Sequence, residues 1–175
     1  MDLSKYIRTI PDFPIEGILF KDITPLLLNG KAITEAAAQL AKPFRADPPD
    51  VIVAPEARGW VFATAMSPLL GDCGVAVARK EGKLPGATVA HTYALEYGES
   101  TIELHADSIA SGQRVLLVDD LLATGGTLVA CEQLIEQLGG RVVGAAFLIE
   151  LDFLGGRGEL GNYPVHTLIH YGAGE

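Results

Sequence analysis

The chain has 175 residues, of which 49% are hydrophobic and 20% charged, and its 22 acidic and 13 basic side chains give a formal net charge of −9. This length suits one domain of roughly 100–200 residues, the composition excludes intrinsic disorder as the main state, and the negative charge disfavours nucleic acid and anionic membranes as partners. The longest stretch without Asp, Glu, Lys or Arg covers residues 160–174, which is shorter than the ~20 apolar residues of a membrane-spanning helix. Because the N-terminus also lacks the apolar core of a secretion signal, we expect one cytoplasmic domain.

Short apolar runs alternate with amphipathic segments along the chain. Hydrophobic residues at helical spacing predict helices over residues 31–44, 60–70 and 127–138. Apolar runs of strand length predict buried strands over residues 50–54, 74–78, 114–118 and 142–149, with a possible fifth at 165–169. Buried strands that alternate with helices indicate an α/β fold with a mostly parallel central sheet and helices on both faces. In such sheets ligands bind at the carboxyl ends of the strands.

Two further stretches have weaker patterns. Residues 88–97 and 101–105 are rich in β-formers and flank the glycine-containing residues 98–100, which predicts a hairpin-like flap. Residues 1–10 are compatible with a short helix that turns Leu3 and Ile7 inward.

The cysteines and two of the histidines offer little chemistry. Cys73 and Cys131 lie far apart among apolar residues, so two buried thiols in a reducing cytosol are favoured over a disulfide. His166 and His170 share one face of the last predicted strand without a carboxylate or cysteine partner. We interpret them as surface or rim residues rather than metal ligands.

The chemistry is concentrated in residues 115–127, which read VLLVDDLLATGGT. An apolar strand ends in Asp119 and Asp120, and a loop from Thr124 to Thr127 then opens a helix. A helix N-terminus favours phosphate, and glycines let the backbone approach an anion closely. Adjacent carboxylates accept hydrogen bonds from sugar hydroxyls or hold a divalent cation. The combination predicts a site for a ribose 5-phosphate.

Two other kinds of phosphate-binding loop do not match this segment. No lysine follows the glycines, so the segment is not a nucleoside-triphosphate loop, and it lacks the glycine spacing of a dinucleotide-binding fold. For an isolated match, a plain helix N-terminus after a solvated acidic turn would be the simpler interpretation.

The whole segment resembles the phosphoribosyl-pyrophosphate binding motif of the type I phosphoribosyltransferases. Further blocks resemble the adenine-specific members of that family and follow the family's order over nearly the whole chain: DFPIEGILFKDITPLL from Asp12, PEARGW from Pro55, RKEGKLPG from Arg79, YALEYG from Tyr93 and FLIELDFLGGRGEL from Phe147. The resemblance implies a single phosphoribosyltransferase domain over residues 1–175, with residues 12–28 in a base-binding hood and residues 80–105 in a flexible flap.

The resemblance also implies a reaction. Adenine and phosphoribosyl pyrophosphate would give AMP and pyrophosphate in purine salvage, with Mg²⁺ carried by the substrate rather than by an assigned protein ligand, and the enzyme would be a homodimer. Two alternatives stay open: an enzyme for hypoxanthine, guanine or xanthine, and a non-catalytic regulator that senses phosphoribosyl pyrophosphate. A regulator should carry a DNA-binding domain and a basic face, for which this acidic chain leaves no room. A 6-oxopurine enzyme commonly places a lysine near the base, and Lys21 is the candidate here.

Roles are carried over residue by residue. The phosphoribosyl group would be bound by Asp119, Asp120, Ala123, Thr124, Gly125, Gly126 and Thr127. Pyrophosphate would be bound by Arg58, Arg79, Lys80 and Lys83. Adenine would be held by Leu19, Phe20, Lys21 and Leu151. Glu96 would be the catalytic residue that manages the purine's proton, and Tyr97 would lie beside it on the flap.

One feature shared with the family and two departures from its pattern affect the predicted site. The peptide between Glu56 and Ala57 is often cis in the family. Glu16 stands where the family often has proline, and Glu81 interrupts a run that is often more basic. We expect Glu16 to alter the flexibility of the hood and Glu81 to weaken pyrophosphate binding.

Overall fold

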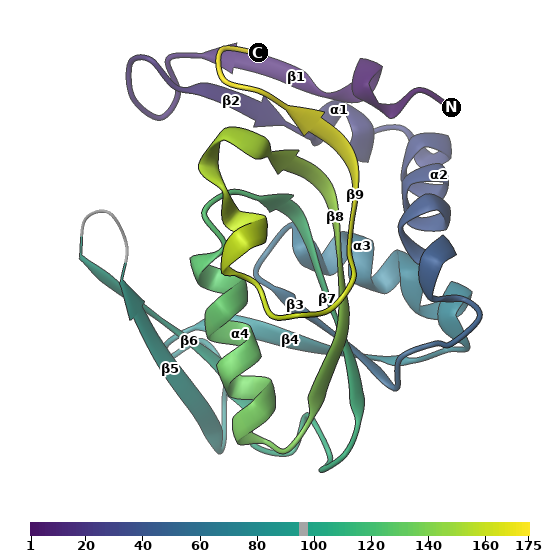
Figure 1. Cartoon of the computed structure of the whole chain (residues 1–175), viewed down its shortest axis with the longest axis vertical. Helices are drawn as coiled ribbons and strands as arrows, with labels where there is room; N and C mark the ends of the chain where they lie inside the picture. Colours follow the sequence, from purple (N-terminus) through teal and green to yellow (C-terminus); the bar gives the residue numbers. More distant parts are fainter. Residues whose placement is uncertain (95–97) are drawn as a thin grey trace.

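A seven-stranded sheet forms the centre of the molecule in this computed structural model, which describes residues 1–94 and 98–175 (Figure 1). The strand order is β5-β6-β4-β3-β7-β8-β9. The strands are β3 (Val51–Pro55), β4 (Gly74–Lys80), β5 (Thr88–Ala94), β6 (Glu99–His105), β7 (Arg114–Leu122), β8 (Arg141–Leu151) and β9 (Val165–Tyr171). Strands β4, β3, β7, β8 and β9 run parallel, which confirms the expected mostly parallel sheet.

The predicted flap, residues 80–105, contains the hairpin of β5 and β6, and this hairpin extends the central sheet. The two strands pair antiparallel with each other, and β6 pairs antiparallel with the end of β4 through Arg79 and Lys80. The sequence predicted the hairpin without its place in the sheet, because that place depends on pairing between residues far apart in the chain.

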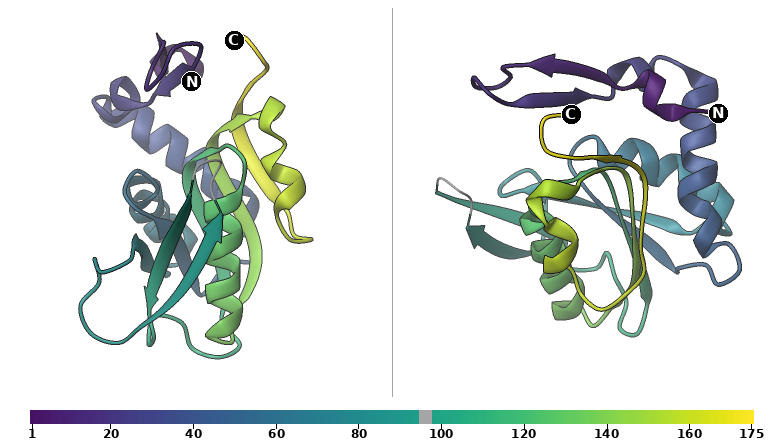
Figure 2. Two further views of the ribbon diagram at one scale, coloured as in Figure 1. Left: turned by 90° about the vertical axis from the view of Figure 1, so that its left-hand side faces the viewer. Right: turned by 45° about the horizontal axis from the view of Figure 1, so that its top comes forward.

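Helices cover both faces of the sheet (Figures 1 and 2). They are α2 (Gly30–Ala41) and α3 (Gly59–Met66) on one face, and α4 (Gly126–Gln137) on the other. Alternate residues of the central strands serve two separate cores: Ile52 and Leu116 pack with the first pair of helices, whereas Val53 and Leu117 pack with α4. Burial on both faces explains why these strands are apolar without interruption.

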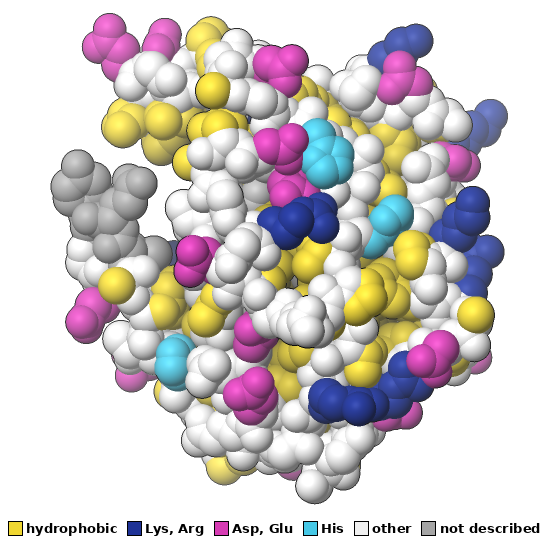
Figure 3. Space-filling model, viewed as in Figure 1, with side chains coloured by type: hydrophobic (Ala, Val, Ile, Leu, Met, Phe, Trp, Pro, Cys, Tyr) yellow, Lys and Arg dark blue, Asp and Glu magenta, His cyan; other side chains and the backbone are white. Residues whose placement is uncertain are grey.

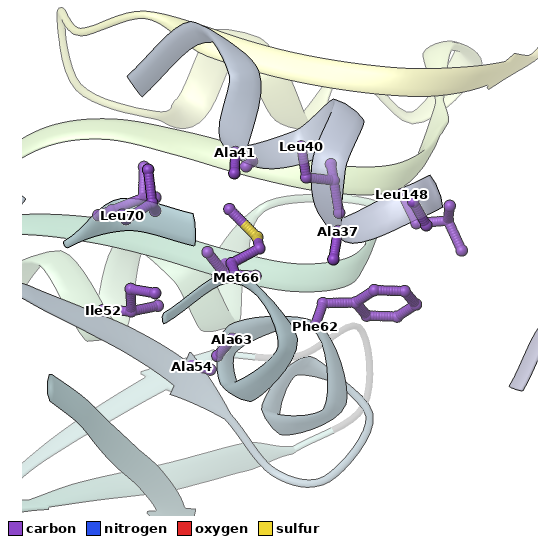
Figure 4. Packing of buried hydrophobic residues seen from close by; sticks show 14 of the residues in the cluster. Ala37, Leu40, Ala41, Ile52, Ala54, Phe62, Ala63, Met66, Leu70 and Leu148 are labelled. Carbon is purple, nitrogen blue, oxygen red and sulfur yellow. The ribbon is translucent and has the colours of Figure 1, made fainter. Parts of the chain in front are cut away.

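The core under α2 and α3 is dominated by small and medium side chains. Ala37 and Leu40 of α2 meet Phe62 and Met66 of α3 in a cluster that includes Leu148 from the sheet (Figure 4). Phe62, Leu40 and Met66 are fully buried. Alanines let the two helices approach closely. Burial of the Phe62 ring and the Met66 side chain between them stabilises this layer.

The ends of the helices follow from local chemistry. The side chain of Asn29 accepts hydrogen bonds from the amides of Lys31 and Ala32 at 3.1 Å, which caps α2. The predicted helix over residues 31–44 ends as an α-helix at Ala41 and continues as the 3-10 helix η2 (Lys42–Phe44) around a proline. The same change occurs where α3 gives way to η3 (Ser67–Leu70).

The N-terminal region differs from the expectation. A 3-10 helix, η1 (Leu3–Tyr6), is followed by a two-stranded antiparallel hairpin of β1 (Arg8–Pro11) and β2 (Leu19–Asp22) and by the short helix α1 (Thr24–Leu27). The predicted helix over residues 1–10 is therefore wrong after Tyr6, although Leu3 is buried as expected. The β1–β2 hairpin lies over the carboxyl-end edge of the sheet, beside the C-terminus (Figure 2).

Two smaller predictions can be compared with the structure. Cys73 and Cys131 are both free and buried, which confirms the thiol interpretation. In the part of the chain that the structure describes, no helix is both long enough and apolar enough to cross a membrane.

Candidate active site

The loop predicted to bind phosphate, residues 123–127 and called the phosphate loop below, connects β7 to α4 at the carboxyl edge of the sheet. A cavity of 90 Å³ is lined by residues of this loop together with Asp119, Leu121 and Leu128. Gly125 has a φ of 87°, and α4 begins at the next residue. A Cβ on Gly125 would lie 2.9 Å from the carbonyl oxygen of Gly156. Only glycine fits this position, because both the backbone conformation and the neighbouring chain exclude a side chain.

The acidic pair lies in the last part of β7, which runs to Leu122, beyond the predicted end at residue 118. Asp120 is 4% exposed and accepts a hydrogen bond from Arg58 Nε at 2.5 Å. Asp119 Oδ1 accepts the backbone amide of Asp120 at 2.8 Å. Burial and, after it, the negative charge of Asp120 raise the pKa of Asp119 well above its usual value.

Asp119 also packs against the start of α3. A Cβ on Gly59, the first residue of that helix, would lie 2.8 Å from Asp119 Oδ1. A side chain there would push the carboxylate out of place, so the glycine of the PEARGW block serves the acidic pair directly. Adjacent carboxylates bind hydroxyl donors or a cation, and either ligand would stabilise the ionised form of Asp119 that the folded protein disfavours.

The four predicted pyrophosphate cations fall into two groups: Arg58 contacts the acidic pair, whereas the other three lie around Glu56. Arg58 is paired with Asp120, as described, so its guanidinium faces the acidic pair. Arg79 donates to Glu56 Oε2 at 2.9 Å and lies over the ring of Trp60, with its guanidinium carbon 5.3 Å from the ring centroid. Its Nη1 also donates to the carbonyl oxygen of Lys83 at 3.1 Å.

Glu56 joins the loop after β3 to the end of β4. Its Oε1 accepts the backbone amide of Lys80 at 2.9 Å while its Oε2 accepts Arg79. The amide of Lys80, and then the Arg79 guanidinium, hold the pKa of Glu56 below its usual value. The peptide between Glu56 and Ala57 is cis. Glu56 thus brings together the two segments that carry the cations, and no local pattern predicts that contact.

A second cavity, of 310 Å³, lies between the β1–β2 hairpin and the C-terminal part of the chain. It is lined by Gly17, Ile18, Leu19, Lys21, Thr124, Leu151, Phe153, Leu154, Ala173, Gly174 and Glu175. Three of the residues predicted to hold the base, Leu19, Lys21 and Leu151, are therefore brought together here, with Thr124 of the phosphate loop in the same wall. Apolar side chains are exposed on both rims, as the yellow groups near the hairpin indicate (Figure 3).

Phe20, the fourth residue predicted to hold the base, does not line this cavity. Its ring packs edge-on against that of Phe13, with centroids 5.0 Å apart, and it alternates with Leu19 and Lys21 along β2. Sequence reasoning missed Ile18, Phe153, Leu154 and the last three residues. Phe153 and Leu154 could have been found, because they lie in the block from Phe147.

The ammonium group of Lys21 is engaged by other groups of the protein. It donates to Thr9 Oγ1 at 3.0 Å and to the carbonyl oxygen of Glu175 at 2.6 Å, and it lies 3.9 Å from the centroid of the Tyr171 ring. Lys21 is only 5% exposed, and this burial lowers the pKa of its ammonium group. Its contacts are with the hairpin and the C-terminal segment.

The flap meets the phosphate loop through one side chain of β5. The hydroxyl of Tyr93 lies 3.0 Å from Thr127 Oγ1, and its ring would be 3.5 Å from a Cβ on Gly126. Glu96 and Tyr97 lie outside the described residues, so their roles stay predictions from the sequence.

One premise about the histidines is wrong, although His170 is exposed and His166 partly exposed, as the surface or rim interpretation requires. His170 does have a carboxylate partner, because its Nδ1 lies 2.8 Å from Asp152 Oδ1. Ligand atoms of Glu150, Asp152 and His170 lie within 4.8 Å of one another. Arg157, however, occupies both oxygens of Glu150. His166 instead lies near the carbonyl oxygen of Gln39, at 3.3 Å.

Comparisons with known proteins agree with this geometry. Residues 22–165 match the model of the phosphoribosyl transferase domain. The chain is 53% identical over 171 residues to the adenine phosphoribosyltransferase of Desulfitobacterium hafniense, with 98% of both chains covered. It is 52% identical over 171 residues to that of Brevibacillus brevis, covering 98% of this chain and 100% of the relative.

A solved structure gives the same result. The crystal structure of adenine phosphoribosyltransferase from Thermoanaerobacter pseudethanolicus superposes with a TM-score of 0.93 at 48% identity, covering 97% of this chain and 98% of that one. The fold, the order of the elements and the sequence of the loop between β7 and α4 are therefore all those of the phosphoribosyl transferase domain.

Proposed function

Because this chain belongs to the phosphoribosyltransferase family, we infer that it transfers the 5-phosphoribosyl group of phosphoribosyl pyrophosphate to adenine, giving AMP and pyrophosphate in purine salvage. One observation carries the inference. The phosphate loop and the apolar cavity share Thr124, so a phosphate group in the loop and a base in the cavity would belong to one nucleotide.

The ribose and its 5-phosphate are assigned to the segment from Asp119 to Thr127. The amides at the start of α4 favour the dianionic phosphate, and the carboxylates of Asp119 and Asp120 accept the ribose hydroxyls. The burial of Asp120, which is 4% exposed, supports this assignment, because hydrogen bonds to a buried carboxylate are stronger than those in water.

Pyrophosphate is assigned to the cations around Glu56. Arg79 and Lys80 end β4, Lys83 lies in the turn that follows, and the position of Arg79 is fixed by Glu56 and Trp60. Positive charge placed in advance stabilises the leaving group as negative charge develops on it. Arg58 supports both sides of the reaction, because it holds Asp120 while remaining half exposed.

Adenine is assigned to the cavity between the hairpin and the C-terminal segment. A base that offers a 6-oxo group would require a free donor, but the ammonium group of Lys21 already has three partners. This observation favours adenine over hypoxanthine, guanine and xanthine. A crystal structure of the Saccharomyces cerevisiae enzyme, 38% identical to this chain with 96% of its own length covered, contains adenine.

The reaction exchanges one bond at the ribose C1. The bond to the pyrophosphate oxygen breaks, the bond to purine N9 forms, and the base loses one ring proton overall. Glu96 is assigned to that proton as a general acid or base. Because the ribose C1 becomes oxocarbenium-like in the transition state, water must be excluded from the site. We assign this task to the flap. Its Gly82, Gly86 and Gly98 all have positive φ values and are suited to act as hinges.

The donors at the end of β7 fit a hard divalent cation. Asp119 and Asp120 offer carboxylate oxygens, the ligand type that Mg²⁺ prefers. Bound with phosphoribosyl pyrophosphate, Mg²⁺ would neutralise part of the charge of the leaving group.

Homodimerisation and a cytoplasmic location complete the proposal. The exposed Phe13, Ile15 and Leu28 offer apolar surface for a second copy. Two free thiols are typical of a reducing compartment.

The assay that tests this function compares purines. Purified protein should form AMP from adenine only when phosphoribosyl pyrophosphate and Mg²⁺ are both supplied. Equal or faster turnover of guanine or hypoxanthine would contradict the assignment of adenine.

A further inference from the structure

The turn after β8 lies against the backbone of the phosphate loop. This turn contains the 3-10 helices η4 (Asp152–Leu154) and η5 (Gly156–Glu159). A Cβ on Gly156 would lie 2.1 Å from the carbonyl oxygen of Ala123 and 2.9 Å from the amide nitrogen of Gly125. The two backbones are therefore in direct contact, with a glycine on each side, and neither segment can shift without moving the other.

Arg157 fixes this turn to the central sheet. Its Nε and Nη2 donate to the two carboxylate oxygens of Glu150 at 3.0 and 2.5 Å. Its Nη1 donates to the carbonyl oxygen of Val165 at 2.9 Å, and Nη2 also reaches Thr167 Oγ1 at 3.1 Å. One guanidinium thus joins the turn to both β8 and β9. Since the side chain of Glu150 is only 7% exposed, this bidentate pair is oriented more strictly than a surface ion pair.

The same turn forms a wall of the base cavity. Phe153 and Leu154 of η4 line that cavity together with Thr124 of the phosphate loop. Asp152, at the start of η4, is tied to β9 through His170. The turn therefore contacts the phosphate subsite through Gly156 and the base subsite through Phe153 and Leu154.

We propose that Gly156 and Arg157 are positioning residues for the transfer reaction: the Glu150–Arg157 pair holds the turn, and the turn holds the phosphate loop in the geometry that binds phosphoribosyl pyrophosphate. The proposal rests on the proposed function, because it assigns the loop to the 5-phosphate. A displacement of ~1 Å in a group that positions substrate can cost ~10²-fold in rate. A small change in the turn should therefore reach the chemistry without any contact to the substrate.

The first test compares two glycines of η5. Gly156→Ala introduces a methyl group against Ala123, whereas at Gly158 a Cβ would meet no atom within 4 Å. Gly156→Ala should lower kcat/KM for phosphoribosyl pyrophosphate by about 10²-fold. Gly158→Ala should stay within about twofold of the wild type, as is usual for a substitution without contacts. In Gly156→Ala, KM for adenine should change less than KM for phosphoribosyl pyrophosphate.

The second test uses milder substitutions, which remain informative if the Gly156→Ala variant does not fold. Arg157→Lys retains the charge but cannot form the bidentate pair, and it should lower kcat/KM for phosphoribosyl pyrophosphate by about tenfold. The double variant Glu150→Gln/Arg157→Met leaves no unpaired buried charge and should show the same loss at a nearly unchanged melting temperature.

The outcomes separate the two proposals. Failure of the wild type to form AMP would overturn the proposed function. An active wild type, together with unchanged parameters for phosphoribosyl pyrophosphate in folded Arg157→Lys and in the double variant, would overturn the positioning role. A lower melting temperature alone, with those parameters unchanged, would also overturn it, because the turn would then only stabilise the fold.

Discussion

The half of the site that we assign to the ribose and phosphate comes from one continuous stretch of chain, whereas the half that we assign to the base is assembled from four separate segments. Residues 119–127 follow one another from β7 into α4. The base cavity is lined by four segments: Gly17, Ile18, Leu19 and Lys21 of the hairpin, Thr124 of the loop, Leu151, Phe153 and Leu154 after β8, and residues 173–175. The first half rests on a buried strand and a helix that pack in the core, and the second lies between a surface hairpin and the C-terminal segment.

This difference separates two kinds of recognition. A phosphate is bound by backbone amides and a helix dipole, which a short loop supplies by itself. A neutral base is recognised by the shape of an apolar cavity with a few polar groups, which needs walls from several directions. Substitutions in the two halves should therefore have separable effects on the two substrates, with the flap acting on the reaction step between them.

The largest effect should come from Glu96, which belongs to neither half. Glu96→Gln removes a group that can exchange a proton but retains a polar side chain of similar shape. We expect single-turnover formation of AMP to slow by about 10²–10⁴-fold, with smaller changes in the dissociation constants of adenine and phosphoribosyl pyrophosphate.

Glu99→Gln is the matched control on the same flap, since Glu99 is exposed on β6. A Glu96→Gln enzyme with the wild-type single-turnover rate would leave catalysis to the cations and the backbone, and the flap would then contribute no proton transfer.

The next effect should be confined to the ribose–phosphate half. Asp120→Asn removes the charge that pairs with Arg58 and weakens the hydrogen bonds to ribose hydroxyls. A hydrogen bond to a charged group contributes about 1.5–3 kcal/mol, so the dissociation constant of phosphoribosyl pyrophosphate should rise at least tenfold, as measured by titration calorimetry. The affinity for adenine should change less. Equal weakening of both substrates would show that the two halves are not separable.

A smaller effect should be confined to the base half. Lys21→Met removes the donor to Thr9 and to the C-terminal carbonyl while retaining an apolar stem of similar length. The two lost hydrogen bonds, about 1 kcal/mol each, hold the wall of the cavity and not the base itself. Only part of that loss should therefore reach adenine binding, and KM for adenine should rise about fivefold to tenfold in steady-state assays. KM for phosphoribosyl pyrophosphate should not change. Lys5→Met is the control, because the side chain of Lys5 is 77% exposed, and a gain of hypoxanthine turnover in Lys21→Met would contradict the role given to this contact.

The smallest effect concerns the stability of the unliganded protein. Burial and the charge of Asp120 raise the folded-state pKa of Asp119 above the ordinary value of 3.8. Stability is therefore lost as pH rises from that value through the folded-state pKa, because the folded protein disfavours the ionised form. Asp119→Asn should melt a few degrees above the wild type at neutral pH, and the two melting curves should converge near pH 3.5. A variant that is less stable than the wild type at neutral pH would contradict this account.

The two halves also differ in how far the sequence predicts them. The apolar run before Asp119, the glycines at 125 and 126 and the amphipathic helix that follows are local signals, and the structure places them as predicted. The hairpin of β1 and β2 carries no comparable signal, because the residues of β1 are mostly exposed and do not alternate. The C-terminal wall and the contact between Gly156 and Ala123 depend on tertiary packing alone.

The sheet illustrates the same distinction. The parallel strands β3, β7 and β8 were predictable because burial on both faces gives each of them an uninterrupted apolar run. The pairing of β6 with β4 was not, since it joins Lys80 to Ile102 across the intervening flap strand. Physical patterns within one segment are read from the sequence, whereas contacts between segments are determined by the fold.

The most direct test of this account is a crystal structure of the protein with AMP. The account predicts the 5-phosphate against the amides of residues 124–127, the ribose hydroxyls within hydrogen-bond distance of Asp119 and Asp120, and the purine in the cavity between residues 17–21 and Leu151. A nucleotide with its phosphate at any other place, or with its base outside that cavity, would contradict it.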